Sequence, residues 1–544
     1  MCGRVSRHAR LPASGELPIF GVAPRRGSVD QRIRLAEVLG SLSLATDLAI
    51  GQPLEHGLRR TLLAVWLGED LGFSADELRD LYYAALLGAV GCTLENAVYA
   101  RYFEDEAVFA CEILSTVDPN RPLDFASFML RKVGKGDPPW RRAAKLFEFV
   151  RQGPDMHAIV CRDVALRVGE MVALGPSVQQ TIAQCHEEWN GTGAPLHLKG
   201  EEMSLAARTF HLAHDAEVFY RIGGLDLALE VVRARSGKQF DPRIAQHFTT
   251  VGPRLFSRLT STSVWDATLT AEPAPVRWLS TEQFDALART IANFVDARSV
   301  YTLGHSAGVA YIAESAARKL ALSAPEIVAV RQAALLHDLG RCGVPVTIWD
   351  NTDRLSADDW SRIKRHPSLS ELILARSAAL GHLGTLAGLH HERLDSSGYR
   401  GVPASFLPLA AQVLAACDAY HTRLERRPHR EAATPAAAAD ELRRQAQDGL
   451  FDSNVVHAIL DTAGQPRWPA KPEWPAGLTD REVEVLRLAA QGLSTRQIAE
   501  TLVVSAKTAD HHIQHVYTKI GVSTRVGATL FALEHGLLAA APRK

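Results

Sequence analysis

The stretch AALLHDLGR, residues 333–341, decides the class of fold and marks a candidate site. Its apolar residues recur at helical spacing, and His337 and Asp338 stand where the apolar run ends. An unpaired carboxylate is costly to bury, so Asp338 needs a cation or a metal ion as its partner. Helical periodicity also covers residues 35–48, 57–71, 75–87, 308–322 and 325–336. Alternating strand patterns are scarce, and we therefore predict an all-α protein.

Further histidines and aspartates lie on both sides of this stretch. The candidate metal ligands are His305, His337, Asp338, His366, His390, His391 and Asp418. Imidazole and carboxylate ligands without thiolates suit iron, manganese or zinc in a hydrolytic site. This set is larger than a single four-coordinate zinc ion needs. It fits two divalent metal ions about 3.5–4 Å apart, with one carboxylate bridging them.

The chain contains an internal repeat. The segment from Glu55 aligns without gaps with the segment from Gly304, so that His56 falls on His305. CHEEWNGTGAP, from residue 185, matches HHERLDSSGYR, from residue 390. A duplicated helical domain of about 200 residues is the simplest interpretation.

The first copy has lost part of the ligand set. It has Gly88-Ala89 where the second copy has His337-Asp338, so it should not hold two metal ions. Four residues of the first copy could still form a different site or serve only in helix packing, and packing is the preferred interpretation. They are Cys161, Cys185, His186 and His214.

Two proline-rich stretches, 271–276 and 464–477, interrupt the helical patterns. We expect a flexible arm at 1–28, a first domain at 29–270, a second at 271–463, a linker at 464–477 and a C-terminal domain at 478–544.

The C-terminal domain has strong helix signals. Thr479 and Glu482 form a capping-box pattern that opens a helix ending near Ala490. Further helices are expected at 495–502, 505–520 and 524–533. Two short helices, a tight turn and a longer third helix describe a helix-turn-helix.

Residues 300–460 resemble the HD-GYP family of metal-dependent phosphodiesterases, known for hydrolysing cyclic di-GMP. The matching motifs are His305-Ser306, His337 to Arg341, Gly343-Val344-Pro345, Arg365-His366-Pro367, His390 to Arg393, Gly398-Tyr399 and Asp418. The resemblance implies a helical bundle, the seven ligands named above, and catalytic roles for Asp338 and Arg341. It also implies substrate contacts by Arg341, Tyr399 and Arg400.

Three departures from the family pattern affect these expectations. Arg400 replaces the proline of the Gly-Tyr-Pro motif, and Arg341 replaces a lysine. Tyr301 stands where members with a third metal carry a glutamate. We therefore expect two metal ions, iron or manganese, with a cyclic dinucleotide or another phosphodiester as substrate.

Residues 478–538 resemble the LuxR-type DNA-binding domain. The matching residues include Leu478-Thr479, Arg481-Glu482, Gly492, Ser494, Ser505, Lys507-Thr508, His512, Tyr517, Lys519, Gly521-Val522 and Arg525. The resemblance implies that residues 505–520 form the recognition helix, with Lys507, Thr508 and His511 near base edges. Gln497, Lys519 and Arg525 are candidates for phosphate contacts. Binding of double-stranded DNA by a homodimer is expected.

Composition fits this interpretation. The chain has 544 residues, 47% of them hydrophobic, and a net charge of −1, which excludes extensive disorder and a uniformly basic surface. Its seven cysteines include no Cys-x-x-Cys pair. No apolar run approaches the roughly 18 residues that span a bilayer. We expect a cytoplasmic phosphodiesterase coupled to DNA binding and transcription regulation. The alternative is a transcription factor that senses a nucleotide or metal without catalysis.

Overall fold

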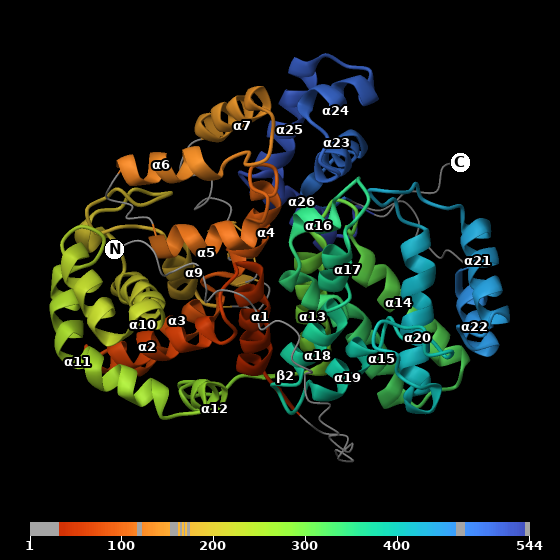
Figure 1. The fold of residues 1–544 in the computed structure, drawn as a ribbon, viewed down its shortest axis with the longest axis horizontal. Coiled ribbons are helices and arrows are strands. Elements are labelled where there is room, and N and C mark those ends of the chain that lie inside the picture. The colour runs from red at the N-terminus through yellow and green to blue at the C-terminus, as the bar shows by residue number, and fades with distance from the viewer. Residues whose placement is uncertain are drawn as a thin grey trace. The chain divides into compact units, whose positions relative to one another are not determined.

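The computed structural model describes residues 32–116, 122–152, 162–163, 166–167, 169–170, 174–463 and 474–538. The expected arm at 1–28, Cys161 and residues 464–473 of the expected linker lie outside the described residues. The regular secondary structure of the described residues is almost entirely helical (Figure 1). The strands found among these residues are β1 and β2, each two residues long. The predicted all-α class is confirmed.

The first repeat opens with three helices whose bounds lie within two residues of the expected ranges. They are α1 (Leu35–Ala49), α2 (His56–Asp70) and α3 (Ala75–Leu87). Further helices described in this repeat include α4 (Val90–Tyr99), α5 (Glu106–Thr116), α6 (Pro122–Lys132), α7 (Pro139–Gln152), α9 (Pro176–Ala183), η2 (Gly200–Glu202), α10 (Leu205–Arg235), α11 (Pro242–Thr260) and α12 (Val264–Thr270). β1 (Ile33–Arg34) pairs antiparallel with β2 (Trp278–Leu279), joining the starts of the two repeats.

The second repeat carries the motifs of the candidate site. Its longer helices are α13 (Thr281–Asp296), α14 (His305–Lys319), α15 (Ala324–Leu336), α20 (Leu409–Arg423), α21 (Pro435–Gln447) and α22 (Ser453–Ala463). Its shorter helices are η3 (Leu339–Gly343), α16 (Val346–Trp349), α17 (Ala357–Ile363), α18 (His366–Leu374), α19 (Gly381–Gly388) and η4 (Ala404–Phe406). The short helices matter for function because their ends carry most of the candidate ligands.

The two repeats arrange equivalent helices in the same way. In the first repeat, α2 packs against α3 and α10, and in the second, α14 packs against α15 and α20. Both α2 and α14 begin after a residue with positive φ, Glu55 at 74° and Gly304 at 77°. This shared turn places His56 and His305 at corresponding helix starts, which supports the duplication inferred from the sequence.

One hydrophobic core runs through both repeats. Buried side chains of α1, such as Leu39, and of α14, such as Val309, belong to the same contact cluster. In Figure 1, α1 stands at the border between the two repeats, where it packs against η3 and α18. The repeats therefore share an interior rather than forming two separate cores.

The C-terminal domain forms the expected helix-turn-helix. Its elements are η5 (Pro475–Gly477), α23 (Asp480–Ala490), α24 (Thr495–Leu502), α25 (Ala506–Ile520) and α26 (Arg525–Glu534). Thr479 and Glu482 make the predicted capping box at α23. Val503, at φ 54°, ends α24 and turns the chain toward α25. Local capping and turn chemistry thus account for these boundaries.

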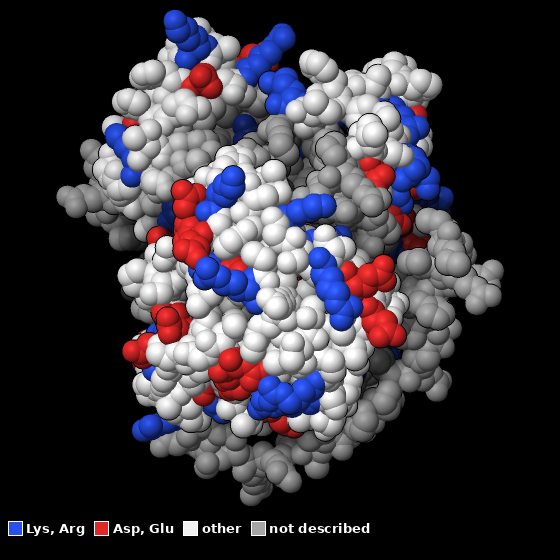
Figure 2. Space-filling model, turned by 90° about the vertical axis from the view of Figure 1, so that its left-hand side faces the viewer, with Lys and Arg blue, Asp and Glu red and all other residues white. Residues whose placement is uncertain are grey.

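The surface carries charges of both signs. Figure 2 shows lysine and arginine interspersed with aspartate and glutamate over one face, in keeping with the net charge of −1. Among the helices of the described part, none combines the length and the hydrophobicity that a bilayer crossing requires.

Candidate metal centre and nucleic-acid interface

The seven candidate ligands lie at helix ends, with one exception. His305 and His366 open α14 and α18, and His337 follows the last residue of α15. Asp338 caps η3, and His390-His391 follow α19. Asp418 alone projects from the interior of a helix, α20. The fold brings these seven residues together in one cluster.

Asp338 occupies the middle of the cluster. Its Oδ2 atom lies 3.7 Å from His305 Nε2 and 3.6 Å from His337 Nε2. Its Oδ1 atom lies 3.3 Å from His366 Nε2 and 3.6 Å from His390 Nε2. Each oxygen of one carboxylate therefore faces its own pair of imidazoles.

Asp418 and His391 complete the two groups. Asp418 Oδ1 lies 3.2 Å from His305 Nε2 and 3.9 Å from His337 Nε2. Its Oδ2 atom lies 3.5 Å from His391 Nδ1. One group with metal-binding geometry contains His305, His337 and Asp418, and another contains His366, His390 and His391. Asp338 lies between them, as a bridging carboxylate would.

Three histidines are oriented by backbone carbonyls at the end of the preceding helix, α15, α17 or α19. The Nδ1–H groups of His337, His366 and His390 donate to the carbonyl oxygens three residues earlier, at 2.7, 2.6 and 2.6 Å. A carbonyl oxygen only accepts, so the proton is held on Nδ1 and the lone pair of Nε2 faces the cluster. Metal-binding histidines are commonly fixed in this way. His337 Nε2 is buried and has no hydrogen-bond partner within the described structure.

The electrostatics of five of the seven ligands favour metal-binding protonation states, whereas Glu425 and Asp418 raise the pKa of His305 against the effect of burial. Burial acts to raise the pKa of Asp338, but His337, Arg341 and His366 hold it well below the ordinary value. The pKa of Asp418 is likewise lowered, chiefly by His305 and His391, against the effect of burial. Burial lowers the pKa of His337, and burial with neighbouring histidines lowers that of His390 to about 3. Ionised carboxylates beside neutral imidazoles are the forms that bind metal ions.

The glycine of the HDLG motif allows two elements to approach closely. A Cβ atom on Gly340 would lie 2.0 Å from the carbonyl oxygen of His366. Ser370 joins the same elements, since its Oγ accepts from the Gly340 N–H at 2.8 Å and donates to the His337 carbonyl at 2.6 Å. These contacts hold the Asp338 side of the cluster against the His366 side.

Two residues of the cluster escaped the sequence analysis. Glu425 lies 3.1 Å from His305 Nδ1, and His421 Nδ1 lies 3.1 Å from Glu425 Oε1. Glu425 thus orients His305 as the backbone carbonyls orient the other histidines. The spacing was a usable signal, because Glu425 follows Asp418 by seven residues, about two helical turns.

The predicted substrate-contacting residues do not all reach the cluster. Arg341 Nη1 lies 3.0 Å from Asp338 Oδ2, and its guanidinium stacks 3.9 Å from the Trp349 ring centre. The Tyr399 ring lies 4.4 Å from the His391 ring. Arg400, in contrast, pairs with Glu371 at 2.5 Å on the protein surface. That Arg400 contacts substrate stays a prediction, since this exposed ion pair with Glu371 would have to open first.

The loop after the paired histidines is held by a buried carboxylate. Glu392 accepts from the N–H groups of Arg400 at 2.9 Å and Val402 at 2.8 Å. In the first repeat, Glu187 accepts from Leu196 and Leu198 in the same manner, at 2.7 and 2.9 Å. This glutamate of the motif therefore shapes the loop rather than binding a ligand.

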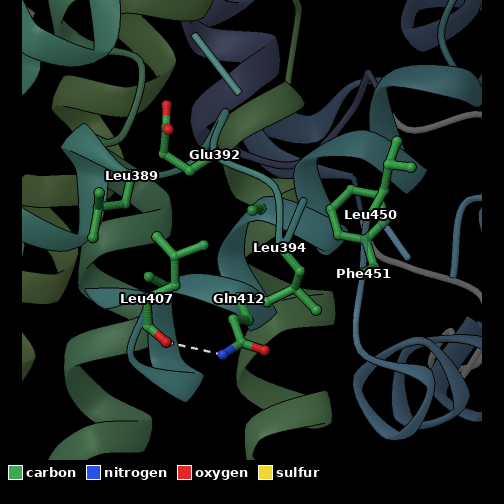
Figure 3. Close-up of a pocket in the computed structure, with 9 residues that line it drawn as sticks. Leu389, Glu392, Leu394, Leu407, Gln412, Leu450 and Phe451 are labelled. Carbon is green, nitrogen blue, oxygen red and sulfur yellow. Dashed lines mark hydrogen bonds between the residues drawn. The ribbon is translucent and has the colours of Figure 1, made fainter. Parts of the chain in front are cut away.

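A small apolar cavity lies behind this loop. Figure 3 shows Leu389, Leu394, Leu407 and Phe451 among the side chains around it. Its volume of about 10 Å³ accommodates at most one water molecule. The cavity is a packing gap and too small to be a substrate site.

The first repeat keeps the shape of this centre without its ligands. His56 is buried and pairs with Glu217, and the ring of His214 lies 5.3 Å from that of His56. Phe210 packs against Gly88, where a Cβ atom would approach its ring to 2.5 Å. In the described residues, every group of three or more candidate ligands close enough to share a metal lies in the second repeat. For the described residues Cys185, His186 and His214, this favours a role in helix packing over a separate metal site.

The recognition helix exposes part of the predicted DNA-binding set. Lys507, Thr508 and His511 are exposed on α25. Lys519 instead contacts Glu482 at 2.7 Å and the Gly477 carbonyl at 3.1 Å.

The other two predicted phosphate contacts also have internal partners. Arg525 hydrogen-bonds Tyr517. Gln497 closes the capping box of α24 with Ser494. Together with Lys519, these side chains stabilise the domain, and the phosphate contacts expected of Gln497, Lys519 and Arg525 stay predictions.

Two known families match the chain, one over most of the second repeat and one over the C-terminal domain. Residues 289–455 match the HD domain family. Residues 476–532 match the family described as bacterial regulatory proteins, luxR family.

Curated relatives extend the match into the first repeat. The chain is 30% identical over 406 residues to the 3′3′-cGAMP-specific phosphodiesterase 3 of Vibrio cholerae, covering 73% of this chain and 88% of that protein. It is 33% identical over 173 residues to the cyclic di-GMP phosphodiesterase response regulator RpfG of Xanthomonas campestris, covering 31% of this chain and 46% of that protein.

A solved structure shows the same architecture. The crystal structure of a cyclic GMP-AMP-specific phosphodiesterase of Vibrio cholerae superposes with a TM-score of 0.56 at 25% identity. The match covers 80% of this chain and 99% of that one, so it spans both repeats.

Proposed function

Because the chain belongs to the HD-GYP-type phosphodiesterases and is a metal-dependent phosphohydrolase, we propose that its second repeat hydrolyses a cyclic dinucleotide with two bound metal ions. The observation that carries the proposal is the position of Asp338, whose two oxygens face two separate histidine groups. One ion would be held by His305, His337, Asp338 and Asp418. The other would be held by Asp338, His366, His390 and His391.

The donor set fits such ions. Neutral imidazoles and ionised carboxylates without thiolates suit iron or manganese. When bound, two metal ions supply an activated water and neutralise charge on the phosphodiester. Arg341 borders Asp338 and is placed to stabilise negative charge on the phosphoryl oxygens. Tyr399 is half-buried, and its ring, beside that of His391, could offer a surface on which a base stacks.

The substrate class follows from the relatives. Cyclic GMP-AMP and cyclic di-GMP are the compounds named for the matched phosphodiesterases, and both are purine cyclic dinucleotides. We propose that this chain cleaves one phosphodiester of such a ring. The C-terminal domain supports a second activity, binding of double-stranded DNA by a homodimer, which would link the hydrolase to transcription.

The decisive experiment measures hydrolysis of 3′3′-cGAMP, cyclic di-GMP and linear diesters by the full chain loaded with manganese or ferrous iron. Asp338→Ala should retain less metal and lower kcat/KM by about 10³-fold, because a bridging ligand supplies several kcal/mol of transition-state stabilisation. Asp395→Ala removes an exposed carboxylate of the following loop and should leave both quantities unchanged.

Two results would contradict the proposal. Equal turnover by the wild type and Asp338→Ala would place hydrolysis elsewhere. Metal-loaded wild type without turnover of any diester would favour a nucleotide or metal sensor that controls DNA binding.

A further inference from the structure

A segment of the first repeat contacts the second repeat next to the candidate metal centre. We call residues 104–106 the Glu106 strap. The Val346 N–H donates to Glu106 Oε1 at 2.5 Å, and the Thr347 hydroxyl donates to the Glu104 carbonyl at 3.1 Å. The strap therefore holds the start of α16, just beyond η3.

Arg298 connects the strap to the catalytic segment. Its Nη1 donates to the carbonyl oxygen of Arg341 at 2.6 Å, and its Nη2 lies 3.9 Å from Glu106 Oε1. Glu106 is fully buried and Arg298 is 5% exposed. A buried carboxylate and a buried guanidinium thus act on the backbone at both ends of residues 341–346.

The same segment carries a side chain of the proposed reaction. Arg341 extends from this backbone to Asp338 Oδ2 at 3.0 Å. The Arg341 N–H also donates to the Asp338 carbonyl at 2.9 Å. Any shift of residues 341–346 would consequently move the guanidinium relative to the bridging carboxylate.

Burial makes the strap sensitive to substitution. Burial raises the pKa of Glu106, and Arg298 and the Val346 N–H oppose that effect. Removal of the carboxylate would leave the Val346 N–H without its acceptor and a buried Arg298 without its nearest anion.

We propose that the first repeat, which has lost the metal ligands, serves the second as a positioning element, with Glu106 and Arg298 fixing residues 341–346 and so the place of Arg341. The catalytic consequence rests on the proposed hydrolase function. The structural part, a backbone segment held across the repeats, does not depend on it.

The test compares Glu106→Ala and Glu106→Gln with the wild type as full-length proteins. Asp105→Ala is the matched control, because Asp105 is in the same strap but pairs with Arg362 of α17 at 3.0 Å. Amide hydrogen exchange of a peptide covering residues 339–349 is measured first. It should rise at least about 10-fold in Glu106→Ala, while Asp105→Ala behaves as the wild type.

Kinetics give the second readout. Because small misplacements of a catalytic group cost up to about 10²-fold, kcat should fall about 10- to 100-fold in Glu106→Ala, with KM and metal content nearly unchanged. Glu106→Gln keeps an acceptor for the Val346 N–H and should recover most of kcat. If Glu106→Ala does not fold, Arg298→Ala tests the same link from the other side.

Unchanged exchange at residues 339–349 in a folded Glu106→Ala protein would overturn the proposal. So would a loss of metal equal to the loss of kcat, since the strap contacts none of the ligands. Failure of the hydrolase proposal is seen separately, as wild-type protein without turnover, and the exchange experiment still decides the positioning role.

Discussion

At the scale of single residues, the centre depends on groups that hold the ligands. His337, His366 and His390 each use a backbone carbonyl near the end of the preceding helix, whereas His305 uses the side chain of Glu425. The first repeat shows the same solution, because His56 pairs with Glu217 although no metal cluster is described there. The carboxylate–histidine contact is therefore part of the fold and does not depend on the other ligands.

Glu425→Ala should weaken metal binding. His305 would lose the acceptor that fixes its Nδ1 proton, and loss of such a partner typically costs about 10- to 100-fold in metal affinity or activity. Metal content after dialysis against a weak chelator measures the effect. Glu431→Ala, at an exposed position six residues later, is the control. Equal metal retention in Glu425→Ala and wild type would show that Glu425 does not orient His305.

At the scale of elements, α25 divides its polar residues between two tasks. Lys507, Thr508 and His511 are exposed near its start, where a recognition helix meets base edges. Lys519, at its end, pairs with Glu482 and the Gly477 carbonyl. Glu482 also caps α23, so Lys519 joins the end of one helix to the start of another.

Substitutions in α25 should separate these tasks. Lys507→Ala and Thr508→Ala should weaken DNA binding by about 5- to 150-fold, which corresponds to the 1–3 kcal/mol of a base contact. Lys519→Ala should lower the Tm of the domain and leave the salt dependence of DNA affinity unchanged. Titration of promoter fragments at several salt concentrations, with thermal unfolding in parallel, provides both measurements. A reduced salt slope for Lys519→Ala would instead show that Lys519 contacts a phosphate.

At the scale of the whole molecule, the repeats are joined through their interiors. α1 packs against η3 and α18, and Ser377 donates to Glu37 of α1 at 2.9 Å in a buried position. Glu106 adds a buried contact from α5. Separation of the repeats would expose the core and leave these buried polar groups unpaired. Each repeat therefore depends on the other for its stability.

The two repeats should therefore unfold together. Calorimetry of the full chain should show one transition for residues 32–463, with any second transition belonging to the C-terminal domain. The C-terminal domain also has its own small hydrophobic clusters, which permits separate unfolding. A control protein ending before residue 464 should keep the main transition. Two resolved transitions in that shortened protein would show that the repeats are independent domains.

The sequence alone predicted the all-α class, five helices of the repeats, the duplication, a candidate ligand set and the helix-turn-helix. Periodicity, capping boxes and motif spacing are local properties, so α3 and α24 lie at their expected positions. The seven candidate ligands were likewise readable, because each is a histidine or an aspartate within a recognisable motif, although Asp418 lies inside α20 rather than at a helix end.

Only the tertiary structure decided how distant groups share partners. It turned Arg400 toward Glu371, Lys519 toward Glu482, Glu425 toward His305 and Glu106 toward Val346. These pairs join different helices or loops. Glu106 and Val346, for example, are 240 positions apart in the chain. Which charge a long side chain meets depends on how helices pack, and helix periodicity carries no information about that choice.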